Sequence, residues 1–198
     1  MGFNISGIAI NKSFKDNFDE LLANFNWEVV FHEEVTFEEA SKNWKDKEIC
    51  DVFFTETGTL LFVNMDLCIE PWRLKDYNVF TFTLSETSMA FNVQYSENMA
   101  LKRSIMEVNG ERLEDSGDNF DFENEVPDTA EIIWRQLGIM LGKSFWDIDF
   151  QAPCRRYSFE IGEKMAYNNS EETPRPEQRE VVFSIVEHSE KKWWQFWK

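Results

Sequence analysis

Two neighbouring stretches of the chain alternate between apolar and polar side chains, and this pattern limits the fold more than any other feature. The apolar members of the two stretches are Phe80, Phe82 and Leu84, then Met89, Phe91, Val93 and Tyr95. A period of two is typical of β-strands that cover one face of a sheet. The hydroxyl-rich segment 85–88 between them predicts a turn, so the two strands should pair antiparallel.

Two more connections predict hairpins. Residues 55–59 join the apolar runs 51–54 and 60–63, and Asn109-Gly110 joins residues 107–108 to 111–112. Asn-Gly favours the positive φ values of a tight hairpin turn. Other segments with strand-like composition are residues 3–10, 27–31, 156–161 and 181–186.

Three segments predict helices, because each begins with an oxygen-bearing residue that is followed three positions later by an acid. They start at Ser13, Thr36 and Asp128, with Pro127 before and Gly142 after the third. The apolar residues at helical spacing are Phe14, Phe18, Leu21, Leu22 and Phe25; Phe37, Ala40 and Trp44; and Ile133, Trp134, Leu137 and Leu141. The expected fold is therefore α+β, a largely antiparallel sheet packed by about three α-helices.

Length and composition favour a single domain. The chain has 198 residues, of which 42% are hydrophobic and 16% aromatic, which is enough to bury one sizeable core. Strand-like sequence follows both irregular stretches, 114–131 and 164–179, so neither is expected to be a domain linker. We predict a single α+β domain over residues 1–190 and a separate C-terminal tail over residues 191–198.

The charge of the chain points to a basic partner. Its 37 acidic and 20 basic residues give a net charge of −17, which repels nucleic acids and anionic lipid surfaces. The sequence has only two histidines and no HExxH, GxSxG, GxGxxG or phosphate-loop motif. We therefore predict a protein that is not an enzyme and has no catalytic residues, cofactor or metal site.

The cysteines and the first residues point to the cytoplasm. Cys50, Cys68 and Cys154 are odd in number and widely spaced, which favours buried reduced thiols over disulfides or a zinc site. The first ten residues lack the features of a secretory signal, and no segment reaches the roughly 18 apolar residues of a membrane span.

An acidic run supplies the first candidate partner-binding residues. Residues 114–131 contain eight acids and no base, so a solvated loop with a strong negative field is expected there. The candidates are Asp115, Asp118, Asp121, Glu123 and Glu125. A calcium loop is an alternative, but the oxygen-bearing side chains do not follow the common 12-residue cadence.

The C-terminal tail supplies the other candidates. Residues 191–198 contain three lysines together with Trp193, Trp194, Phe196 and Trp197. Such a segment either packs on its own acidic domain, docks on a partner or touches a membrane, and eight residues offer too little apolar area for stable membrane anchoring. The candidate partner-binding residues are Trp193, Trp194 and Trp197.

Four segments carry a resemblance: residues 1–8, 84–89, 103–111 and 142–146. In them the chain resembles uncharacterised bacterial families of small acidic cytosolic proteins, some of which are similar to immunity proteins of polymorphic toxin systems. The resemblance covers most of the chain and implies a protein that binds and blocks a basic toxin, without active-site residues. The alternatives are a small-molecule or peptide-binding protein with an aromatic-lined cleft and, third, an enzyme. Oligomeric state is not predicted.

Overall fold

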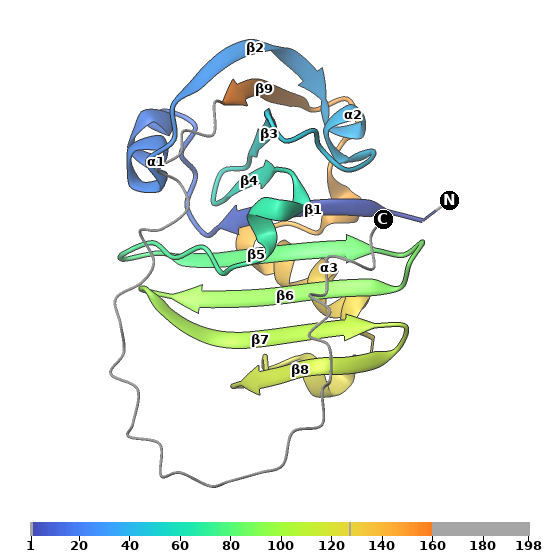
Figure 1. Ribbon diagram of the computed structural model, residues 1–198. Helices are drawn as coiled ribbons and strands as arrows, with labels where there is room; N and C mark the ends of the chain where they lie inside the picture. The colour runs from blue at the N-terminus through green and yellow to red at the C-terminus, as the bar shows by residue number, and fades with distance from the viewer. Residues whose placement is uncertain (1, 127, 160–198) are drawn as a thin grey trace, which may run out of the picture. The chain divides into compact units, whose positions relative to one another are not determined.

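The computed structural model describes residues 2–126 and 128–159, which form one antiparallel sheet of nine strands with three α-helices (Figure 1). The strands are β1 Asn4–Ile10, β2 Val29–Thr36, β3 Ile49–Phe54, β4 Thr59–Phe62, β5 Asn78–Ser85, β6 Ala90–Glu97, β7 Ala100–Val108, β8 Glu111–Gly117 and β9 Pro153–Phe159. The helices are α1 Phe18–Phe25, α2 Phe37–Ser41 and α3 Thr129–Leu141, with 3₁₀ turns η1 Met65–Cys68, η2 Glu123–Glu125 and η3 Phe145–Asp147. The predicted antiparallel sheet with about three α-helices is confirmed, and strands dominate the fold.

The strand order is β2-β9-β3-β4-β1-β5-β6-β7-β8. Strands β5 to β8 form a meander in chain order, as Figure 1 shows in green and yellow-green. The last described strand, β9, returns to the other half of the sheet and pairs with both β2 and β3. Segments far apart in the sequence are therefore brought together in that half of the sheet.

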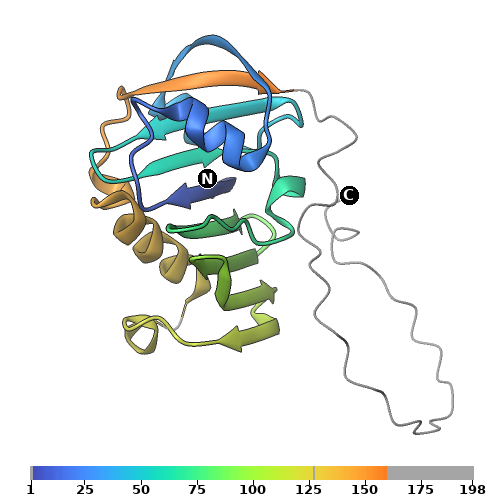
Figure 2. The ribbon, with the colours of Figure 1, turned by 90° about the vertical axis from the view of Figure 1, so that its left-hand side faces the viewer.

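Both faces of the central strands of the sheet are covered, whereas the edge strands β2 and β8 are largely exposed. Phe80, Phe82 and Leu84 pack with α2 and α3 on one face, which confirms the predicted apolar face of this strand. The opposite face packs against α1 and η1, and Figure 2 shows α3 and η1 on opposite sides of the sheet. Thr81 is therefore also buried, and its hydroxyl oxygen accepts a hydrogen bond of 3.1 Å from the Trp72 backbone N–H. The alternation of apolar and polar side chains correctly predicted strand β5. It could not show that a loop covers the face that carries the polar side chains.

The three predicted hairpins are confirmed. β5 pairs with β6, β3 with β4 and β7 with β8, all antiparallel. At the last turn Asn109 and Gly110 have φ values of 53° and 80°, as a two-residue turn that matches the twist of its strands requires.

Two of the three predicted helix starts are confirmed. The Thr36 side chain accepts a hydrogen bond from the Glu39 N–H at the start of α2, and Asp128 accepts one from the Ala130 N–H at the start of α3. Gly142 ends α3 with a φ of 69°. Helix α1 is a correction, because it begins at Phe18 and the Ser13 hydroxyl donates to the Thr55 carbonyl, 2.7 Å away.

The acidic run is a second correction. Part of it lies in strand β8 and part in η2, so it is not a solvated loop throughout. Arg103 on β7 and Arg112 on β8 itself form ion pairs with several of its acids. Several acids of this run therefore pair with arginines that are not part of it, before it in the sequence and, at Arg135, after it.

Other predictions are tested only in part. Cys50, Cys68 and Cys154 are free and buried, as predicted. Pro127, the strand candidate 181–186 and the tail 191–198 lie outside the described residues. Among the residues that the structure describes, no helix has the length and apolar character needed to cross a membrane.

Candidate functional site

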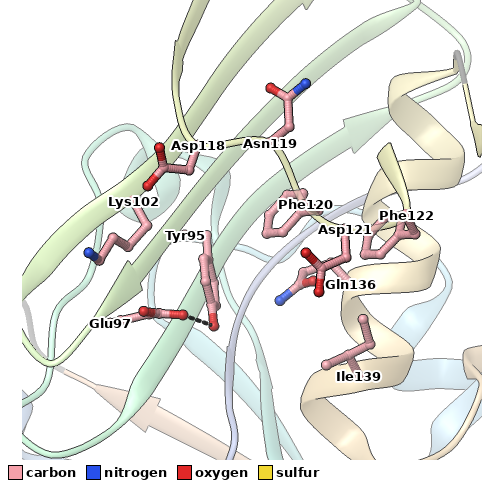
Figure 3. A pocket seen from close by; sticks show the side chains of 10 residues that line it. All are labelled: Tyr95, Glu97, Lys102, Asp118, Asn119, Phe120, Asp121, Phe122, Gln136 and Ile139. Carbon is pink, nitrogen blue, oxygen red and sulfur yellow. Dashed lines mark hydrogen bonds between the residues drawn. The ribbon is translucent and has the colours of Figure 1, made fainter. Parts of the chain in front are cut away.

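A pocket of about 300 Å³ lies between the sheet, the segment 118–122 and α3 (Figure 3). The residues that line it are Tyr95, Glu97, Lys102, Asp118, Asn119, Phe120, Asp121, Phe122, Gln136 and Ile139. They come from β6, β7, the connection after β8 and α3, so the pocket forms only when the meander and the helix have assembled. We call it the acidic pocket.

Tyr95 and Glu97 form one wall of the acidic pocket. They are two positions apart on β6 and therefore point to the same side of the strand. The Tyr95 hydroxyl donates a hydrogen bond of 2.9 Å to Glu97 Oε1 (Figure 3). Burial and the neighbouring Glu97 carboxylate raise the pKa of Tyr95. The phenol keeps its proton and donates it in a hydrogen bond to Glu97.

Aromatic rings line a second wall. Phe120 and Phe122 stack with their ring centroids 5.4 Å apart and an interplanar angle of 1°. Tyr95 lies against Phe120 at a centroid distance of 5.4 Å. The Arg135 guanidinium lies 5.9 Å from the centroid of Phe122. This wall offers ring faces, whose negative π density attracts cations.

A buried ion pair holds the segment that carries these rings. The Arg103 side chain is 1% exposed and donates to Glu123 through Nε at 3.0 Å and through Nη2 at 2.5 Å. Glu123 Oε2 also accepts a hydrogen bond from the Phe120 backbone N–H at 3.1 Å. The Asp118 N–H donates to the Lys102 carbonyl at 2.9 Å. These bonds position residues 118–122 over the strands.

The charges around the acidic pocket do not cancel. Among the described residues that line it, Glu97, Asp118 and Asp121 face a single Lys102, which leaves two negative charges in excess. Among the described residues none of the three carboxylates forms an ion pair, although many other acids of the protein do. The excess charge is therefore available to an occupant from outside.

Gln136 adds a polar group at the base of the acidic pocket. It lies on α3 and is 3% exposed, and its side chain extends into the space between that helix and Tyr95 (Figure 3). Within the described part of the chain its carboxamide has no hydrogen-bond partner. Its nitrogen and oxygen are not among the described side-chain atoms that are both sealed from solvent and without a partner, so they reach the space of the pocket. A carboxamide aimed into a pocket is typical of a position where a ligand completes the bonds.

The predicted acids divide into two groups. Asp118 and Asp121 line the acidic pocket. Asp115 binds Arg103 and Arg112 at 2.6 Å each, Glu123 is 7% exposed beside Arg103, and Glu125 binds Arg135 at 3.2 Å. The Arg112 and Arg103 guanidiniums hold the pKa of Asp115 below its usual value.

The second group therefore acts within the protein, where its ion pairs hold the acidic segment against the sheet. Trp193, Trp194 and Trp197 lie outside the described residues, so their partner-binding role stays a prediction.

Sequence reasoning missed Tyr95, Glu97, Phe120 and Gln136. Two signals were present: the acidic run contains the pair Phe120 and Phe122, and Gln136 stands on the otherwise apolar face of the third predicted helix. An aromatic pair in an acidic run and a polar residue on a buried helix face both suggest a built site. No pattern of neighbouring residues in the sequence indicates that β6 and α3 lie next to each other in the fold.

Comparison with known proteins gives no relatives, since the chain matches no family model and no significant match exists among curated proteins or solved structures. Over residues 2–126 and 128–159 no group of three or more His, Cys, Asp or Glu side chains is placed to hold a metal ion.

Proposed function

We propose that this chain is an acidic protein-binding module that docks a basic protein at the acidic pocket. The observation that carries the proposal is the set of three carboxylates without ion pairs, Glu97, Asp118 and Asp121, around a wall of stacked aromatic rings. Carboxylates and ring faces both attract cations. Their combination favours a basic side chain as the occupant.

The net charge and the pocket act at different stages of association. A charge of −17 spreads a negative field that accelerates encounter with a positively charged protein. Affinity comes from a few buried anchor contacts, which are enriched in aromatic and arginine side chains. The acidic pocket supplies such an anchor point.

The most concrete form of the proposal is an immunity protein that neutralises a basic toxin. In this form the acidic surface covers the basic active site of the toxin and excludes its substrate. The net charge of −17 supports this form, and so does the pocket, because toxins that act on nucleic acids need cationic surfaces to hold phosphates.

A pull-down from the native host with a matched pair of variants tests the proposal. The variant Asp118→Asn/Asp121→Asn removes two charges at the pocket. The control Glu38→Gln/Asp147→Asn removes two charges at exposed acids that form no ion pair in the described structure. We expect the wild type and the control to retain one basic protein at low salt, and the pocket variant to lose it.

High salt should release the same protein from the wild type, because screening weakens the encounter and the charged contacts. Equal recovery by both variants, or recovery that salt leaves unchanged, contradicts docking at the acidic pocket.

A second candidate function is the binding of a small polar molecule in the same pocket. Its volume of about 300 Å³, its aromatic wall and the Gln136 carboxamide fit the lower end of small-molecule sites. Native mass spectrometry of protein from the host distinguishes the two. A retained metabolite, together with no basic protein in the pull-down, favours this candidate.

A further inference from the structure

We infer that the acidic pocket accepts an arginine side chain of the partner and discriminates against lysine. This inference rests on the proposed function and names the chemical group that the pocket recognises. It depends on three features of the described structure: the arrangement of acceptors, the ring wall and the unpaired Gln136 carboxamide.

The acceptors of the pocket match a donor that is spread over a plane. Glu97 and Asp118 stand at one side, while Asp121 and Gln136 stand at the other (Figure 3). A guanidinium has five N–H donors in a planar fork, so one group can bond several acceptors around it. A lysine ammonium is a compact point charge with three donors, so it can bond fewer of these acceptors at once.

The ring wall favours the same group. Phe120 and Phe122 are parallel, and Tyr95 leans against the first of them. A guanidinium stacks flat on a ring and is more weakly hydrated than an ammonium, so less hydration is lost when it enters an aromatic pocket. Arg135 lies outside the acidic pocket, with its guanidinium 5.9 Å from the centroid of Phe122, and is an example of the same pairing within this protein.

Gln136 adds a hydrogen-bond acceptor that favours an arginine head group inside the pocket. Its carbonyl oxygen accepts an N–H from the arginine head group, a bond that no described residue of the protein itself makes. A neutral group of the same shape, such as the ureido group of citrulline, bonds the amide but leaves the excess negative charge of the pocket uncompensated. Charge and shape are therefore both required.

Lys102 sets a limit on affinity. Within the described part of the chain its amino group is the only cationic group that lines the pocket, and it forms no ion pair there. It opposes an incoming cation, so Lys102→Ala is expected to strengthen arginine binding about two- to fivefold. Weakening of the site by this variant contradicts a cationic occupant.

NMR titration of the full chain with three blocked tripeptides, acetyl-Gly-X-Gly-amide, tests the inference. With arginine as X, we expect saturable shifts of the Gln136 side-chain amide and the Phe120 backbone amide. With lysine, binding should be at least about fivefold weaker, and with citrulline it should be weaker still. Equal or tighter binding of the lysine peptide overturns the inference.

Two substitutions at one position separate recognition from folding. Gln136→Leu keeps the volume but removes the acceptor, and it should weaken arginine binding about fivefold and erase the preference over lysine. Gln136→Glu restores an acceptor and should restore the preference. Thermal unfolding confirms that each variant is folded, and an arginine preference that survives in a folded Gln136→Leu variant contradicts the role given to this residue.

The inference and the proposed function fail in different ways. If a basic protein is captured through Asp118 and Asp121 but no arginine peptide binds, docking stands and the arginine assignment fails. If the arginine peptide binds but no protein is captured, the assignment stands and the protein-docking function fails.

Discussion

Two buried ion clusters lie on the α3 face of the sheet, one in each half, and they are electrostatic opposites. In the half formed by β3 and β9, the buried centre is an anion, Asp51, which is 0% exposed. In the half formed by β7 and β8, the buried centre is a cation, Arg103, which is 1% exposed. Each centre is held by two partners of opposite charge.

The Asp51 cluster is closed. Lys45 binds the Asp51 carboxylate at 2.7 Å, and Arg156 binds it through two nitrogens at 2.8 Å and 2.9 Å. Arg156 also binds Glu39 at 2.8 Å, which ties α2 to the sheet. The Asp51 carboxylate raises the pKa of Arg156 further above its already high value. The buried centre is fully compensated by its own protein.

The Arg103 cluster borders the acidic pocket. Asp115 and Glu123 compensate the guanidinium, and the chain between these two acids carries Asp118 and Asp121, which have no ion-pair partner in the described structure. The comparison teaches that paired acids fix the position of the segment, while its unpaired acids face outward. The first cluster should therefore affect stability alone, and the second should affect stability and binding.

The largest expected effect is at Asp51. Asp51→Ala leaves Lys45 and Arg156 next to each other without their shared anion, and an uncompensated buried charge is strongly destabilising. We expect the free energy of unfolding to fall by about 3–5 kcal/mol, as measured by urea denaturation. If the folded fraction is sufficient, binding at the acidic pocket should be unchanged. If the free energy of unfolding falls by less than about 1 kcal/mol, water reaches the Asp51 cluster and screens its charges.

Arg103→Met should lower the free energy of unfolding by about 2–3 kcal/mol, because the buried Glu123 then keeps only Arg112, 3.8 Å away, as a cationic partner, whereas Asp115 can turn to water. The loss should be smaller at pH 4 than at pH 7. A carboxyl that is buried without a partner has a raised pKa, so its penalty disappears once the pH is low enough to protonate it.

The same variant should weaken peptide binding, since Glu123 positions Phe120. If a folded Arg103→Met variant binds the arginine peptide as the wild type does, the Arg103 cluster affects stability alone, as the Asp51 cluster does, and the proposed difference between them is wrong.

Two glycines at the ends of β8 sharpen the comparison. Gly117 has a φ of 88°, and a Cβ there would lie 2.0 Å from the Lys102 carbonyl oxygen, whereas a Cβ at Gly110 (φ 80°) meets no atom within 4 Å. Gly117→Ala should therefore lower the free energy of unfolding by about 2 kcal/mol and weaken peptide binding. Gly110→Ala should lower it by about 1 kcal/mol and leave peptide binding unchanged. Thermal unfolding and peptide titration check both, and equal effects would show that the close approach at Gly117 is tolerated.

The smallest effect concerns Asp115. Its pKa is lowered in the folded state by Arg112 and Arg103, so its stabilisation is present above the usual Asp pKa of about 4 and is lost as the pH falls below that value. A ¹³C titration of the side chain should give a midpoint below that usual value. Asp115→Asn should reduce the acid sensitivity of β8 in hydrogen exchange. A normal midpoint would show that the exposed part of this pair is screened by solvent.

Local patterns predicted much of the fold. Alternation at residues 80–84, the Asn109-Gly110 turn and the cap at Asp128 each depend on neighbours in the sequence, and each is confirmed. Helix α1 was placed too early because Ser13 finds a partner in the Thr55 carbonyl, 42 positions away. Spacing cannot reveal such a contact.

The site was predictable only in part. Asp118 and Asp121 were selected because charge density is visible in the sequence, but Asp115 was selected for the same reason and is used internally. What separates them is Arg103, which approaches only when β7 pairs with β8. Gln136 reaches the same place from α3, so its role depends on packing between helix and sheet.

The most direct test compares two variants of equal charge in their affinity for the arginine tripeptide. Asp118→Asn/Asp121→Asn and Glu38→Gln/Asp147→Asn each remove two negative charges, so the general field of the protein changes equally in both. We predict that the first weakens binding about tenfold or more and that the second changes it less than about twofold. Equal weakening by the two variants would show that the net charge alone attracts the peptide, and would contradict the acidic pocket as a site.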